Sequence, residues 1–88
     1  MWRIWFRLRG AGLHPARVQE LKHSLRNFDA RVSVGDPWLD VHVRVAGHEG
    51  PASAIGDAAQ MLRVQAANVG VEDCRILVVH AERIEASP

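Results

Sequence analysis

The stretch Trp2–Arg9, WRIWFRLR, decides the fold of this chain. Its apolar residues alternate one by one with arginines and a second tryptophan, which is the period of a β-strand with two unlike faces. On a helix, at about 100° per residue, Arg3, Arg7 and Arg9 would not gather on one side. One face of the strand can therefore enter a core, while the other presents three guanidinium groups around the indole of Trp5.

Length and composition indicate one small domain. The chain has 88 residues, a net charge of +1 and 48% hydrophobic residues, as in an ordinary globular protein. Its single cysteine, Cys74, excludes an internal disulfide and fits a reducing compartment. The aliphatic run Ile76–Val79 is far too short to span a bilayer, and the N-terminal stretch lacks the continuous apolar segment of a signal peptide. We expect a cytoplasmic protein that does not bind membranes.

Alternation and helical spacing predict the remaining elements. The predicted helices cover residues 16–28 and 52–68. The predicted strands, besides the first, cover residues 29–34, 38–46 and 74–82. Gly35-Asp36-Pro37 forms a turn in this interpretation, and Gly70 is placed to end the second helix. A single domain over residues 1–83 is then followed by a short tail, 84–88.

The order strand, helix, strand, strand, helix, strand predicts an α+β domain with a ferredoxin-like βαββαβ topology. Each helix has one main apolar stripe, so both must cover the same face of the sheet. In the second helix the main stripe is expected to be Ile55, Ala59, Leu62, Ala66 and Val69, beside a weakly apolar one made of Ala54, Ala58, Met61 and Gln65. Right-handed crossovers then give a four-stranded antiparallel sheet in the order 4-1-3-2. No helix is left for the second face of this sheet, which we call the open face.

Aromatic and charged side chains are assigned to the open face by the alternation. The residues expected to form a binding surface there are Arg3, Trp5, Arg7, Arg9, Trp38, Asp40, His42, Arg44, Ile76 and Val78. The last strand is apolar on both faces, and we expect Leu77, Val79 and Ala81 to point to the core. Ile76 and Val78 then lie on the open face with His80 and Glu82.

Aligned strand centres predict the neighbours across the two central strands. The expected pairs are Arg7–Asp40, Trp5–His42, Arg9–Trp38 and Arg3–Arg44. The first is an ion pair and the third a cation–π contact, each worth about 0.5–1 kcal/mol. The last is unfavourable unless an anion or a partner lies between the two arginines.

Self-association through the open face is the function that this pattern favours. Ile76 and Val78 beside Trp5 would form an apolar patch that a monomer would not leave in water. Tryptophan and arginine are frequent anchors of protein interfaces, and a domain of this size has a thin stability margin that association would widen. We expect a non-enzymatic interaction module, either a homodimer or a complex with another protein, anchored by Trp5 and Trp38.

Nucleic-acid binding by the same face is the alternative. Indoles among arginines can stack bases and hold phosphates, so the ligand in that case is RNA or single-stranded DNA. With aromatic residues on both central strands, the chain resembles RNA-recognition modules in topology. It departs from them on the third strand, which reads WLDVHVRV over residues 38–45 in place of their aromatic motif.

No pattern in the sequence indicates catalysis, a metal or a cofactor. The five histidines are scattered, and no two have the spacing of paired metal ligands on a helix. Cys74 follows Glu72 and Asp73, whose charges oppose formation of the thiolate. Asp40 and His42 share a face at short spacing, but no nucleophile accompanies them. We therefore expect no enzyme, no cofactor and no bound metal.

Overall fold

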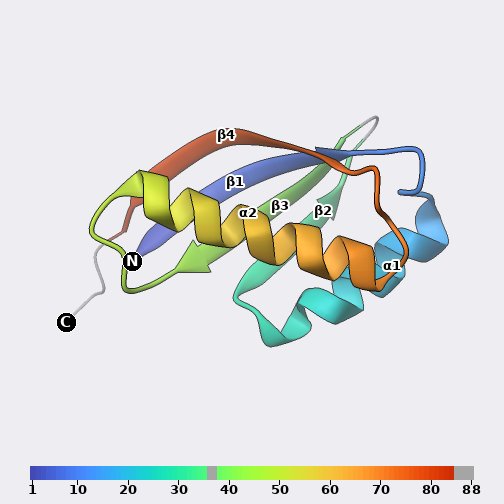
Figure 1. Ribbon diagram of the computed structural model, residues 1–88, viewed down its shortest axis with the longest axis horizontal. Coiled ribbons are helices and arrows are strands. Elements are labelled where there is room, and N and C mark those ends of the chain that lie inside the picture. The colour runs from blue at the N-terminus through green and yellow to red at the C-terminus, as the bar shows by residue number, and fades with distance from the viewer. Residues whose placement is uncertain (36–37, 85–88) are drawn as a thin grey trace.

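The computed structural model describes residues 1–35 and 38–84 and confirms the predicted topology (Figure 1). Its elements are β1 (Trp2–Arg9), α1 (Pro15–Ser24), η1 (Leu25–Asn27), β2 (Ala30–Val34), β3 (Leu39–Val45), α2 (Pro51–Asn68) and β4 (Arg75–Arg83). Neighbouring strands pair antiparallel in the order β2-β3-β1-β4. This is the ferredoxin-like α+β arrangement, with β1 and β3 central and β2 and β4 at the edges of the sheet.

The core lies between the sheet and the helices. Its buried members from β1 and β3 are Ile4, Phe6, Leu8, Leu39, Val41 and Val43. Its buried members from α1, η1 and α2 are Val18, Leu21, Leu25, Ala54, Ala58 and Leu62. The alternating residues of both central strands thus separate into a buried face and an outer face, as the sequence predicts.

The buried stripe of α2 differs from the predicted one. Ala54 and Ala58 are 0% and 3% exposed, whereas Ile55 and Ala59, which the spacing assigns to the stripe, are only partly buried. Small side chains at the centre of the contact let the helix lie close to the sheet, with larger ones at its flanks. The stripe that contains Ile55 was expected to be buried because it is the more hydrophobic of the two. Hydrophobicity alone does not show how closely a helix can approach the sheet.

The first helix ends before its predicted end at residue 28, whereas the second ends where predicted. The predicted first helix ends at Ser24 and continues as η1, after which Phe28 takes an extended backbone and is 40% exposed. The predicted end of α2 is confirmed: Gly70 has φ +86°, and its N–H donates to the carbonyl of Ala67 at 3.0 Å. The N–H of Val71 donates to the carbonyl of Ala66 at 2.8 Å, which completes a Schellman cap.

Two predicted segments fall mainly on residues that the structure does not describe. Asp36 and Pro37 of the predicted turn and residues 85–88 of the predicted tail lie outside the described residues. On either side of the turn, the N–H of Gly35 donates to the carbonyl of Trp38 at 2.9 Å, which closes the hairpin between β2 and β3.

The edge strand β4 contains a β-bulge. Phe6 lies opposite Val78 and Trp5 opposite His80, so Val79 is an extra residue on β4 between two regular pairs. A bulge of this kind bends its strand and shifts the face to which the side chains before it point. The strand therefore does not keep one period of two from end to end.

Because of this bulge, the expected faces of Ile76, Val78 and Leu77 are wrong. Val79, expected in the core, is the extra residue and is 40% exposed. Ile76 lies opposite buried Leu8 and packs against the core, and Val78 lies opposite a core residue as well. Leu77, expected in the core, lies opposite Arg7 on the open face and is 49% exposed. The run is apolar on both faces, so its pattern does not reveal where the extra residue lies.

Candidate functional site

In the described part of the chain, α1 and α2 lie on one side of the sheet and no helix covers the open face (Figure 1). The strands bring eight of the ten predicted site residues to it: Arg3, Trp5, Arg7, Arg9, Trp38, Asp40, His42 and Arg44. Its other members are Asp29, Arg31, Ser33, Arg75, Leu77, His80 and Glu82. Ile76 and Val78 do not belong to this face, because the bulge in β4 places them opposite core residues of β1.

Asp40 holds the centre of the open face together. Its Oδ1 atom accepts a hydrogen bond from Trp5 Nε1 at 3.0 Å and another from Arg7 Nε at 3.2 Å. The guanidinium carbon of Arg7 lies 5.1 Å from the centre of the Trp5 ring. The predicted pairing of Arg7 with Asp40 is confirmed, and the carboxylate fixes the orientation of the half-buried indole as well.

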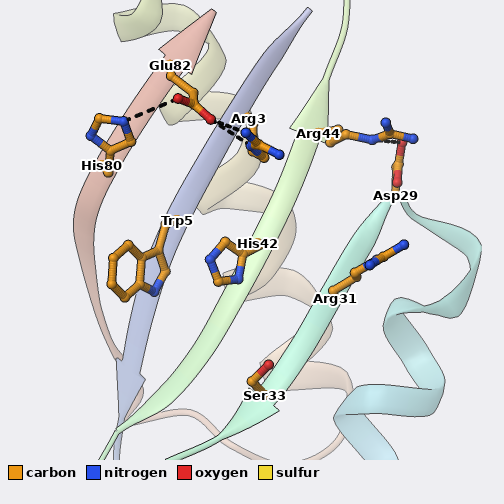
Figure 2. A pocket seen from close by; sticks show the side chains of 9 residues that line it. All are labelled: Arg3, Trp5, Asp29, Arg31, Ser33, His42, Arg44, His80 and Glu82. Carbon is orange, nitrogen blue, oxygen red and sulfur yellow. Dashed lines mark hydrogen bonds and ion pairs between the residues drawn. The ribbon is translucent and has the colours of Figure 1, made fainter. Parts of the chain in front are cut away.

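Two aromatic contacts extend this centre. Trp5 and His42 are direct neighbours across β1 and β3, with ring centres 5.5 Å apart and planes 16° from parallel. Figure 2 looks onto the open face and shows the two rings side by side. Towards one end of the sheet, the guanidinium carbon of Arg9 lies 5.4 Å from the ring centre of Trp38, as predicted.

Arg3 and Arg44 are opposite one another, as predicted, but each turns to a carboxylate of its own chain. Arg3 forms an ion pair with Glu82 of β4, and Arg44 Nε donates to Asp29 at 2.8 Å (Figure 2). The expected repulsion is thus relieved inside the chain, without an external anion. Hydrogen bonding and charge from Arg3 hold the pKa of Glu82 below its ordinary value.

Asp29 and Glu82 belong to this face but were not among the predicted site residues. For Glu82 the signal was available, since it was placed on the open face with His80. Asp29 lies just before β2 and its carboxylate reaches Arg44 across the neighbouring strand. For Asp29 the signal was available too, because the alternation of the predicted strand 29–34 places it on the open face with Arg31 and Ser33.

The charge of the open face is positive. Among the described residues it carries six arginines (Arg3, Arg7, Arg9, Arg31, Arg44 and Arg75) against the three carboxylates of Asp29, Asp40 and Glu82, a net charge of +3 with neutral histidines. The whole chain has a net charge of +1, so the remainder carries −2. A positive face on a nearly neutral molecule favours anionic partners.

The open face contains a hollow of about 600 Å³ (Figure 2). Its lining includes Arg3, Trp5, Arg31, Ser33, His42 and Arg44. Asp29, His80 and Glu82 also contribute to it. Arg31 differs from the other two arginines because no ion-pair partner lies near it among residues 1–35 and 38–84.

Besides the open face, the molecule has a second candidate surface, an apolar edge strip on β4 made of Leu77, Val78 and Val79. These side chains are 49%, 44% and 40% exposed. The strand is nine residues long, and in the described chain only β1 pairs with it. Unpaired backbone groups and exposed aliphatic side chains therefore coincide at this edge.

Three further findings concern metal binding, thiol chemistry and membrane spanning in the described part of the chain. Within residues 1–35 and 38–84, no three His, Cys, Asp or Glu side chains are grouped so that they could hold a metal ion. Burial, reinforced by the charge of Asp73, raises the pKa of the Cys74 thiol, which disfavours the reactive thiolate. Neither helix in the described part has the length and apolar character needed to cross a membrane.

No protein-family model matches the chain, and no curated protein shows significant similarity to it. Its function must therefore be inferred from the open face and from the edge of β4.

Proposed function

We propose that the protein is a cytoplasmic, non-enzymatic interaction module that forms a homodimer through the β4 side of its sheet. The observation that supports this most is the apolar edge strip, in which three consecutive aliphatic residues are 40–49% exposed on an edge strand. Natural proteins usually protect such edges with charges, prolines, bulges or covering segments, and within the strip itself β4 has only the bulge. Burying the strip against another strand removes apolar surface from water and pairs the free backbone groups.

A second copy of the same strand is a suitable occupant. Antiparallel pairing about a two-fold axis between Val78 and Val79 gives a self-complementary contact. The facing pairs are then Arg75 with the partner's Glu82, Ile76 with the partner's Ala81, and Leu77 with the partner's His80. The two charges of the first pair are opposite, which favours this register by about 0.2–1 kcal/mol.

The bulge makes this register consistent with the two faces of the sheet. Arg75 and Leu77 lie on the open face before the bulge, and His80 and Glu82 lie on it after the bulge. The residues that face one another across the two-fold axis therefore point to the same side, as antiparallel pairing requires. Without Val79, the axis would lie on a single residue, Val78.

Packing of one open face against another has less support. Each face carries a net charge of +3, so two copies brought together would repel. The contacts of Trp5, the expected anchor, with Asp40, Arg7 and His42 all lie away from the β4 edge. An association through the edge leaves these contacts intact and keeps both open faces in solvent.

Sedimentation equilibrium tests the homodimer. The wild-type protein is expected to have twice the chain mass of 9.8 kDa, and Val78→Lys is expected to reduce it to the monomer mass by placing a charge in the apolar edge strip. Val64→Lys is the matched control, because Val64 of α2 is also 44% exposed. Circular dichroism confirms that both variants fold. A monomeric wild type would contradict the proposal and show that the bulge alone protects the edge.

Single-stranded nucleic acid at the open face is a second candidate. The observation that favours it is the net charge of +3 concentrated there, more than the +1 of the whole chain. Binding of a fluorescent single-stranded RNA is expected to weaken with rising salt and with alanine at Arg3, Arg7 and Arg44. Alanine at Arg17, Arg26 and Arg63, which lie on α1, η1 and α2, is the control of equal charge. Equal losses in the two triple variants would contradict recognition by the open face.

A further inference from the structure

We propose that the hollow in the open face binds a nucleotide unit, a planar base that carries a phosphate, with the base over Trp5 and His42 and the phosphate at Arg31. The unit can come from a free mononucleotide or from a single-stranded chain, because both present the same base and phosphate. This inference does not rest on self-association, and it narrows the second candidate function to one site.

The aromatic floor of the hollow supports the position of the base. Trp5 and His42 lie side by side in the view onto the open face (Figure 2), with planes 16° from parallel. The bond from Trp5 Nε1 to Asp40 holds the indole in place before any ligand arrives. The held indole and the nearly parallel imidazole of His42 together offer a broader stacking surface than one ring, and stacking tolerates any base.

The arginines support the position of the phosphate. Arg3 and Arg44 line the hollow but are already paired with Glu82 and Asp29, whereas Arg31 lacks an ion pair in the described residues. Arg31 lies directly opposite His42 across β2 and β3, so its exposed side chain begins beside the aromatic floor, and its guanidinium, which Figure 2 shows turned away from the two rings, must swing towards them to meet a phosphate. A guanidinium can donate two parallel hydrogen bonds to a phosphate, and the hydroxyl of Ser33, on the same strand, is a further donor.

Charge and size also fit this class of ligand. The hollow has three arginines and two carboxylates, so its net charge is positive. This charge favours an anionic ligand over a cationic one. The volume of about 600 Å³ lies within the range of roughly 300–1,000 Å³ that is typical of sites for small ligands. Because the hollow opens to solvent on the uncovered sheet face, a longer nucleic-acid chain can extend beyond the bound nucleotide on either side.

Titration calorimetry with four probes tests this site: adenosine monophosphate, adenosine, inorganic phosphate and a short single-stranded oligoadenylate. Adenosine monophosphate is expected to bind more tightly than adenosine or phosphate alone, because only it has both groups. Arg31→Ala is expected to weaken its binding about tenfold or more. Arg63→Ala, on the helix side of the sheet, is the control and is expected to leave binding unchanged.

The outcomes separate the source of the nucleotide from the existence of the site. If the oligoadenylate binds more tightly than adenosine monophosphate, and Arg31→Ala abolishes this binding, the ligand of the site is a nucleic-acid chain. If the two probes bind equally tightly, the ligand is the free nucleotide. Phosphate that binds as tightly as adenosine monophosphate would overturn the role of the aromatic floor. Equal weakening by Arg31→Ala and Arg63→Ala, or no binding of either nucleotide probe, would overturn the site. The sedimented mass is measured on the same samples, so failure here leaves the homodimer proposal standing.

Discussion

At the scale of single residues, Asp40 holds the centre of the open face, because its Oδ1 atom accepts hydrogen bonds from both Trp5 and Arg7. Its side chain is 26% exposed, so its removal leaves a half-buried indole N–H without its acceptor. We expect Asp40→Ala to lower the free energy of unfolding by about 1–2 kcal/mol in urea titrations. Asp29→Ala breaks an ion pair that is about half exposed on both sides, and we expect a loss below about 0.5 kcal/mol. Equal losses would contradict this ranking.

The ion pair of Glu82 with Arg3 predicts a pH dependence. The Arg3 guanidinium holds the pKa of Glu82 in the folded chain below its ordinary value of 4.5. A lowered folded pKa means that the stabilisation is fully present above the ordinary value and is lost as pH falls through the folded pKa. In an NMR titration we expect Arg3→Ala to return the pKa of Glu82 towards 4.5. An unchanged pKa would show that His80, the weaker cause, is sufficient by itself to lower the pKa of Glu82.

At the scale of secondary-structure elements, two glycines of α2 and its cap should respond in opposite directions to the same substitution. Gly70 has φ +86°, so alanine there is strained, and we expect Gly70→Ala to cost about 1 kcal/mol. Gly56 lies inside α2 with nothing within 4 Å of an added Cβ, and Gly56→Ala should stabilise by about 0.5–1 kcal/mol. Urea midpoints at one protein concentration measure both. Shifts of the same sign would contradict the cap assignment.

The strands differ in how far the sequence could predict them. β1 and β3 alternate between apolar and polar residues, so their faces, their pairing and the contact of Arg7 with Asp40 all followed from the pattern. β4 is apolar on both faces, and no residue type marks Val79 as the extra one. Its faces were therefore assigned wrongly, and the apolar edge strip could not be foreseen. The partners of Arg3 and Arg44 also depend on side-chain directions that alternation does not specify.

At the scale of the whole molecule, the domain is elongated and its core is thin. The described chain measures 39 × 22 × 20 Å along its principal axes, and most of the large buried side chains belong to a single layer between the sheet and the helices. A chain this short buries only about 60–65% of the surface that it exposes when unfolded. Pairing through β4 would extend the sheet without changing that layer, so it would bury apolar surface outside the existing core.

Thermal unfolding at several protein concentrations follows from this arrangement. If folding and dimerisation are coupled, a tenfold increase in concentration stabilises the dimer by about 1.4 kcal/mol, which corresponds to a rise in Tm of roughly 4 °C for two chains of this length. We expect this rise for the wild type and for Val64→Lys. Val78→Lys should unfold at a lower Tm that does not change with concentration, because it lacks the paired edge. A wild-type Tm that is constant over the range in which sedimentation shows a dimer would mean that the chain folds independently of its partner.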